Sequence, residues 1–164
     1  MRLSNRNKAP LFQFYFTALL MLIVGGIGLF FIERYRLDFM GKESYLLIIV
    51  PIVLFVIFYM RGRQIFEYDS DGEALNFKNR SVVGVVGKIV SDEFPKYKLL
   101  KFEIVDALIL KKLYITISSK KSNAIVLKYD ISYLSGKEIK DLRFSLNKVV
   151  KANKENKRDN NNQW

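Results

Sequence analysis

Residues Leu11–Ile32 have the sequence LFQFYFTALLMLIVGGIGLFFI, which is an uncharged run of 22 residues. At a rise of about 1.5 Å per residue, an α-helix of this length spans the ~30 Å hydrocarbon core of a bilayer. Aromatic residues gather at both ends of the run, as they do at the two interfaces of a membrane. The run therefore predicts a transmembrane helix.

Residues 1–10 precede this helix and contain Arg2, Arg6 and Lys8, so we interpret them as a basic cytoplasmic tail. A signal peptide also begins with positive charge, but its apolar core has about 7–15 residues and ends at a small-residue cleavage site. The run here is longer, and residues Phe30–Glu33 contain no such site. An uncleaved membrane anchor is the preferred interpretation.

A second uncharged run, Tyr45–Met60, follows a short charged connector. Its length corresponds to roughly 24 Å of helix, which nearly spans the hydrocarbon core. Together the two runs predict a two-helix membrane hairpin over residues 11–63. The candidate helix-packing residues are Gly25, Gly28 and Pro51, because small residues let membrane helices approach closely and proline kinks a helix. We expect these residues to pack within the hairpin in preference to packing against another protein.

The basic residues beside membrane helices indicate which flanks stay in the cytoplasm. The two outer flanks hold more of them than the connector does, which predicts a multi-pass protein of the cell inner membrane with both termini in the cytoplasm. The outer residues are Arg2, Arg6, Lys8, Arg61 and Arg63, and those in the connector are Arg34, Arg36 and Lys42.

From Gln64 onward, apolar residues recur at every second position, which is the period of a half-buried strand. Runs of this kind on both sides of an Asp-Gly turn predict a first β-hairpin. Later runs predict a middle strand and a second hairpin. The expected strands are Ile65–Tyr68, Leu75–Lys78, Ser81–Val90 with bends at Gly84 and Gly87, Leu100–Ile104, Leu113–Ser118 and Ala124–Asp130.

A single amphipathic helix is expected after these strands. Ser135 and Glu138 have the spacing of a capping box, in which the side chain of each residue accepts a hydrogen bond from the backbone amide of the other residue. The apolar residues that follow share one helical face, which should lie across an end or a face of the sheet. Residues 153–164 are rich in Lys and Asn and are predicted to be disordered. The soluble domain is accordingly placed at residues 64–152 and is expected to fold alone.

Several strands in sequence, closed by one C-terminal amphipathic helix, give the order of a pleckstrin-homology (PH) domain. The chain resembles bacterial PH-like membrane proteins, in which a membrane hairpin carries such a domain. The resemblance implies a membrane α-helical hairpin followed by a small α+β domain, a PH-like β-barrel or sandwich capped by a C-terminal helix. It rests on Phe66–Phe77 (FEYDSDGEALNF) as the first hairpin, Phe94–Val105 (FPKYKLLKFEIV) as a middle strand and Leu134–Leu142 (LSGKEIKDL) at the start of the helix.

The first hairpin loop departs from the PH-like pattern. Phosphoinositide-binding PH domains place basic residues there, whereas this loop carries Asp69, Asp71 and Glu73, which repel phosphate. No headgroup pocket and no site residue is therefore carried over from the resemblance. The same acidic loop has too few ligand positions for a calcium loop and lacks flanking helices, so we interpret it as a plain turn.

The composition excludes several kinds of chemistry. The chain has no Cys and no His, which excludes thiolate catalysis, imidazole acid–base catalysis and the common zinc sites. No paired carboxylates accompany a nucleophile, so we predict a protein that is not an enzyme and that has no cofactor, no metal and no small-molecule substrate. Nucleic-acid binding would require an aromatic or helical reader beside the basic residues, and none is evident.

The formal net charge of +11 is the remaining functional signal. It suits a solvated surface or contact with the anionic lipids of the bilayer. The candidate lipid-contact residues are Arg61, Arg63, Lys111, Lys112, Lys120 and Lys121. We expect a non-catalytic, membrane-tethered binding or scaffold module that recruits a protein partner. The alternatives are an auxiliary subunit of a membrane complex that acts through its transmembrane helices, and an anionic-lipid sensor.

Overall fold

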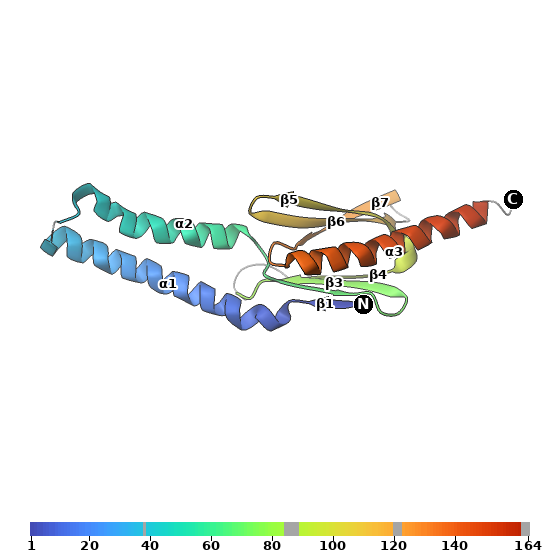
Figure 1. Cartoon of the computed structure of the whole chain (residues 1–164), viewed down its shortest axis with the longest axis horizontal. Coiled ribbons are helices and arrows are strands. Elements are labelled where there is room, and N and C mark those ends of the chain that lie inside the picture. The colour runs from blue at the N-terminus through green and yellow to red at the C-terminus, as the bar shows by residue number, and fades with distance from the viewer. Residues whose placement is uncertain (38, 84–88, 120–122, 162–164) are drawn as a thin grey trace.

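A helical hairpin at one end of the molecule is joined to two antiparallel sheets and a long C-terminal helix at the other (Figure 1). The computed structural model describes residues 1–37, 39–83, 89–119 and 123–161. The strands are β1 (Arg2–Ser4), β2 (Ile65–Asp69), β3 (Ala74–Arg80), β4 (Val90–Pro95), β5 (Leu99–Ala107), β6 (Leu110–Ser119) and β7 (Asn123–Asp130). The helices are α1 (Ala9–Ile32), α2 (Leu46–Met60) and α3 (Gly136–Asn161), with short helical turns η1 (Arg6–Lys8), η2 (Glu33–Leu37), η3 (Gly41–Tyr45) and η4 (Lys96–Lys98).

Helices α1 and α2 pack side by side, and with their flanking turns both are long and apolar enough to cross a membrane. The prediction of two long apolar helices is confirmed, and their bounds agree with the predicted runs to within two residues at each end. Aromatic rings join the helices, with Phe16 and Phe55 at 6.1 Å and Phe30 and Tyr45 at 5.5 Å between ring centroids. In the connector, the buried Glu33 carboxylate accepts the amide of Met40.

The first sheet has the strand order β1-β2-β3-β4. The predicted first hairpin is confirmed as β2 and β3, with Tyr68 opposite Phe77. Strand β1 precedes the helical hairpin in the sequence, and it pairs with β2, which follows the hairpin, over Arg2 to Ser4. The hairpin of α1 and α2 is therefore inserted between two neighbouring strands of one sheet.

The structure differs from the sequence prediction at both ends of the chain. Residues 1–10, predicted to be a basic tail, contain β1, because Leu3 enters the core and the backbone pairs with β2. Helix α3 continues to Asn161, through most of the tail predicted to be disordered. Residues 137–161 contain no Gly or Pro, and a helix that has already formed extends at low cost through Lys, Glu and Arg, although this stretch also contains Asn and Asp.

The middle of the domain also differs from the prediction. Phe94–Val105, predicted to be one strand, is divided at η4 into the end of β4 and most of β5, which belong to different sheets. Pro95 has no amide to donate and begins this break. Of the predicted strand at Ser81–Val90, Ser81 to Val83 and Ile89 are not in a strand and β4 begins at Val90, while Gly84 and Gly87 lie outside the described residues.

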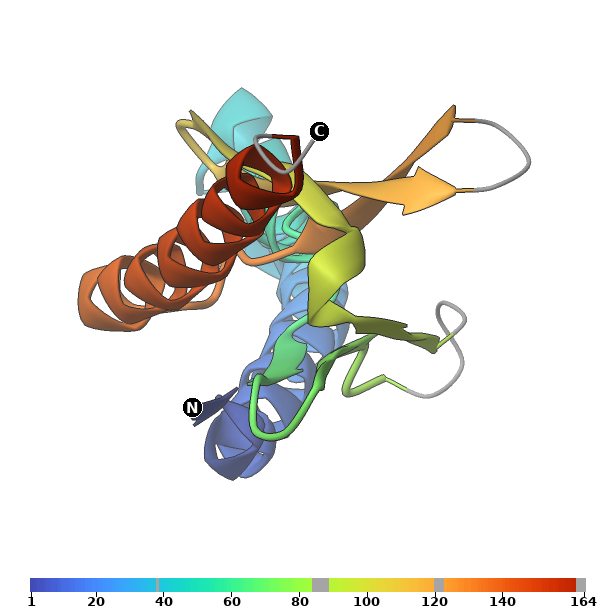
Figure 2. The same cartoon turned by 90° about the vertical axis from the view of Figure 1, so that its right-hand side faces the viewer.

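The second sheet has the order β5-β6-β7, and β6 and β7 confirm the predicted second hairpin. The two sheets form separate layers, and α3 runs along one side of them (Figure 2). Phe77 of the first sheet stacks on Tyr129 of the second at 5.0 Å between centroids, so the core lies between the layers. The buried core residues are Leu3, Phe66, Tyr68, Leu75, Phe77, Phe94, Leu99, Leu113, Ile115, Tyr129, Ile131, Leu134, Leu142 and Leu146.

Helix α3 closes this core as the sequence predicts. The Ser135 amide donates to a Glu138 carboxylate oxygen at 2.6 Å, and the Glu138 amide donates to the Ser135 hydroxyl at 3.3 Å, which confirms the capping box. Leu142 and Leu146 are completely buried, and Ile139, Val149 and Val150 pack around them.

Candidate functional site

The loop between β7 and α3 attaches the domain formed by the two sheets and α3 to the helical hairpin through Tyr133. Its ring meets Phe12 edge-on at 4.9 Å, and its hydroxyl donates to the carbonyl of Phe58 at 3.3 Å. The Arg61 guanidinium lies over the ring at 4.8 Å from the centroid. Burial raises the pKa of Tyr133 although Arg61 opposes the rise, so the phenol stays protonated and can donate. One side chain thus touches both helices of the hairpin.

Two ion pairs flank this junction. Lys8 lies 3.1 Å from Glu138, and Arg63 lies 3.4 Å from Asp130. Partial burial opposes ionisation of Glu138, but hydrogen bonds from Ser135 and the charge of Lys8 outweigh it and lower its pKa. Residues next to both helices are therefore bound to the domain, which sits directly on the base of the hairpin.

The residues predicted to contact anionic lipid divide into three groups. Arg61 and Arg63 lie in the junction. Lys111 and Lys112 lie at the start of β6, where Lys111 pairs with Asp106 at 2.8 Å. Lys120 and Lys121 lie outside the described residues. The structure thus brings the first four to the end of the domain that faces the hairpin.

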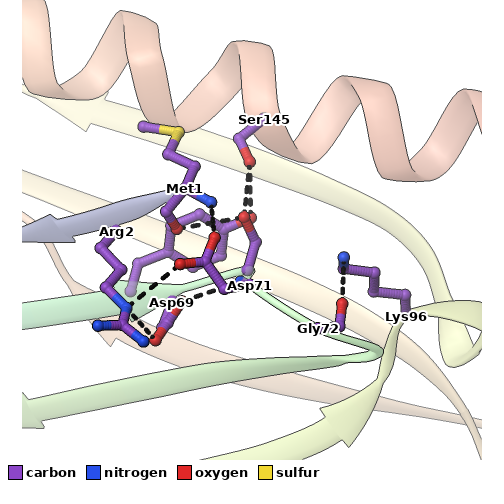
Figure 3. A network of polar contacts seen from close by, with 9 residues as sticks. Met1, Arg2, Asp69, Asp71, Gly72, Lys96 and Ser145 are labelled. Atoms are coloured by element: carbon purple, nitrogen blue, oxygen red, sulfur yellow. Dashed lines mark hydrogen bonds and ion pairs between the residues drawn. The ribbon is translucent and has the colours of Figure 1, made fainter.

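The acidic β2–β3 loop lies at the opposite end of the domain (Figure 1). Two carboxylates beside this turn are engaged within the chain: the Arg2 guanidinium lies 2.9 Å from Asp69 and 3.3 Å from Asp71 (Figure 3). Nearby, the hydroxyls of Tyr68 and Ser145 are 3.0 Å apart, which fastens β2 to α3. Burial raises the pKa of Tyr68, although the bond to Ser145 opposes the rise.

A groove of about 800 Å³ runs between the β2–β3 loop, η4 and α3 at this distal end. Two exposed aromatic side chains line it, Tyr97 (69% exposed) and Phe144 (74% exposed). Lys96 and Lys148 also line it, with Glu73 as its acidic residue. We call this feature the distal groove.

The distal groove is held open by the chain itself. The side-chain amide of Asn153 donates to the carbonyls of Lys96 at 2.7 Å and Leu99 at 2.9 Å, which fixes η4 against α3. The backbone amide of Lys96 donates to the carbonyl of Glu73 at 2.9 Å, which fixes η4 against the β2–β3 loop. An apolar side chain that binds here meets a preformed surface, which lowers the entropy cost of binding.

The predicted helix-packing residues lie in different surroundings. Pro51 is buried and faces Gly26, the glycine of the same run that lies between Gly25 and Gly28. A Cβ atom added to Gly26 would lie 2.2 Å from the carbonyl oxygen of Leu47, so the glycine permits the close approach of α1 and α2. Cβ atoms added to Gly25 and Gly28 would meet nothing within 4 Å, so a side chain at either position would face open space in this chain.

We predict that Gly26→Val separates the helices, because its branched side chain has to displace backbone of α2. The expected cost is about 1–3 kcal/mol of hairpin packing. The chain has no cysteine, so Phe16→Cys with Phe55→Cys reports the contact by disulfide formation in membranes. Gly25→Val and Gly28→Val are the matched controls and should leave the cross-linking yield unchanged. An unchanged yield for Gly26→Val would contradict the close approach.

Sequence reasoning missed the side chains that define the junction and the distal groove. The sequence indicates that Phe144 is exposed, because this large aromatic residue lies outside the apolar face of α3. The sequence gives no such indication for Tyr97 and Tyr133, because their positions depend on how η4 and the β7–α3 loop fold. Within the described ranges, no three His, Cys, Asp or Glu side chains cluster in a way that could hold a metal ion.

Comparison of the chain with protein-family models, with curated proteins and with solved structures found no match.

Proposed function

We propose that this protein is a membrane-tethered, non-catalytic binding module that recruits a protein partner through the distal groove. The observation that carries the proposal is the placement of two exposed aromatic side chains and two lysines in a preformed groove, at the end of the domain opposite the helical hairpin. Contiguous exposed apolar surface rimmed by polar residues is typical of protein-binding sites. Aromatic residues are also the commonest anchors of such interfaces.

The partner that fits this groove is a peptide segment with an apolar anchor and acidic neighbours. Tyr97 and Phe144 offer ring faces to an apolar side chain, and Lys96 and Lys148 outnumber Glu73 among the charged lining residues. Charge complementarity of this kind favours encounter with an acidic partner and suppresses basic ones.

We place the hairpin of α1 and α2 in the inner membrane of a bacterial cell, with both chain ends in the cytoplasm. The apolar surface of both helices and the excess of basic residues in the outer flanks support this placement. For the soluble domain we propose a PH-like architecture. The order of a four-stranded sheet, a three-stranded sheet and a C-terminal helix supports it.

Photo-crosslinking in cells tests the proposed function. A photoreactive amino acid at position 97 or 144 of the full chain should give the same adduct, because both side chains line one groove. The matched control is position 126, where Val126 on β7 is also exposed (60%) but lies outside the groove. Lys148→Glu should weaken the adduct by several-fold if the partner segment is acidic. Equal adducts at 126 and 144 would contradict the proposal.

The open surroundings of Gly25 and Gly28 favour one second candidate, an auxiliary subunit whose helices pack against another membrane protein. The same experiment separates the two. Adducts from positions 25 and 28 with none from 97 or 144 would support the auxiliary subunit and overturn the adaptor. Adducts with lipid alone would support the anionic-lipid sensor.

A further inference from the structure

The turn between β5 and β6 has a composition unlike that of a hairpin turn. Ala107 pairs with Leu110, so the turn consists of Leu108 and Ile109. Leu108 has φ 32°, in the left-handed region where two-residue hairpins usually place Gly, Asn or Asp. Its side chain is fully exposed (relative exposure 104%), and Ile109 is 44% exposed. Neither turn geometry nor core packing explains two bulky apolar residues here.

The position of the turn offers an explanation. It lies at the end of the domain from which α1 and α2 extend (Figure 1). Hydrogen bonds give the same placement: the amide of Ile131 donates to the carbonyl of Lys111 at 2.8 Å, and the amide of Lys111 donates to the hydroxyl of Ser132 at 2.9 Å. The start of β6 is therefore bound to the β7–α3 loop, whose Tyr133 contacts the end of α2.

The charges beside the turn suit a lipid surface. Lys111 and Lys112 follow the apolar tip directly after Leu110, and Lys111 is also paired with Asp106. Basic residues at the membrane surface are attracted by anionic headgroups, while apolar side chains gain by entering the boundary with the acyl chains. An apolar tip with basic residues behind it satisfies both requirements.

We propose that the Leu108–Ile109 turn inserts into the headgroup–acyl boundary of the bilayer that α1 and α2 cross. This inference rests on the proposed membrane placement of the hairpin. The turn is then a third membrane contact beside the two helices. It limits tilting and rotation of the domain, so that the distal groove is presented away from the lipid.

The absence of native cysteine allows a direct test on the full chain. Leu108→Cys is labelled with a thiol-reactive NBD dye and reconstituted into vesicles of equal parts phosphatidylcholine and phosphatidylglycerol, with and without brominated acyl chains. We expect the emission to shift to the blue and to be strongly quenched by the brominated lipid. The matched controls are Glu73→Cys at the distal end, expected to stay unquenched, and Val53→Cys within α2, expected to be quenched.

The pattern of quenching distinguishes insertion of the turn from membrane placement of the hairpin. Quenching at 53 without quenching at 108 would overturn the inserted turn and leave the membrane placement of the hairpin standing. No quenching at 53 would overturn the membrane placement and the inserted turn with it. Since the vesicles contain no other protein, quenching at 108 cannot come from a partner helix that covers the turn.

The variant Leu108→Gly tests whether the leucine is needed for folding. Glycine adopts positive φ without strain, so this variant should keep or raise the melting temperature of the domain. A marked fall in the melting temperature would show that Leu108 stabilises the fold, and it would overturn the proposal that the residue is present for the membrane.

Discussion

A soluble protein in which residues 1–8 are joined to residues 62–161 by a flexible linker is expected to fold cooperatively and to be more stable than the fragment 62–161 alone. The linker replaces the helical hairpin, and about eight Gly/Ser residues reach roughly 15 Å on average. That is sufficient because the two segments already touch: the side-chain amide of Asn5 donates to the carbonyl of Gln64 at 2.9 Å.

The difference in the free energy of unfolding arises from the contacts that residues 1–8 make with the rest of the domain. Leu3 is buried in the core, which is worth about 1.5–3 kcal/mol for a side chain of this size. The Asn5 carboxamide oxygen accepts the amide of Phe66 at 2.9 Å, and each such bond adds about 1 kcal/mol. The linked protein should therefore be about 3–5 kcal/mol more stable, a large part of the 5–15 kcal/mol that typically holds a domain together.

Urea unfolding followed by circular dichroism measures this difference. The control is the linked protein carrying Leu3→Ser and Asn5→Ala, which should fall to the stability of the fragment. Both proteins lack the helices that cover Tyr133, so that loss cancels in the comparison. A fragment 62–161 as stable as the linked protein would show that β1 pairs with β2 without supporting the fold.

Local patterns in the sequence were sufficient for the elements that are long or regularly alternating. The uncharged runs predicted α1 and α2 because length and apolarity alone decide whether a helix can span a bilayer. Alternation around Asp71–Gly72 predicted β2 and β3, and the capping box predicted the start of α3. In each case the signal lies within about twenty consecutive residues.

The remaining elements depend on partners that are distant in the sequence. The three residues of β1 are too few to show a period, and their partner strand begins 60 residues later, beyond the hairpin. Regular alternation in Phe94–Val105 holds only from Leu100 to Ile104, and it gives no sign that the residues before η4 belong to another sheet. Arg61 and Arg63 could be placed at the hairpin because they follow its second helix directly in the sequence. Tyr133 reaches the same place only through the fold of the β7–α3 loop.

The second large effect is expected from Leu142→Asp, which should unfold the domain formed by the two sheets and α3. Leu142 is completely buried where α3 closes the core. The substitution removes its packing and leaves an unpaired carboxylate in apolar surroundings, so we expect a loss of more than about 4 kcal/mol. Trypsin digestion of the full chain in detergent, with loss of the melting transition, measures the effect. A variant that resists trypsin and melts cooperatively would show that α3 does not dock as described.

Phe144→Asp is the matched control on the same helix. Its side chain is 74% exposed, so the same new charge stays in water and the melting temperature should stay close to that of the wild type. The two variants also separate folding from binding. Leu142→Asp should lose the photo-crosslinked adduct from position 97 because the groove no longer exists. Phe144→Asp should lose it with the fold intact, because an aromatic wall of the groove is gone. A Phe144→Asp variant that keeps the adduct would show that the partner does not depend on Phe144, and it would contradict the proposed aromatic anchor.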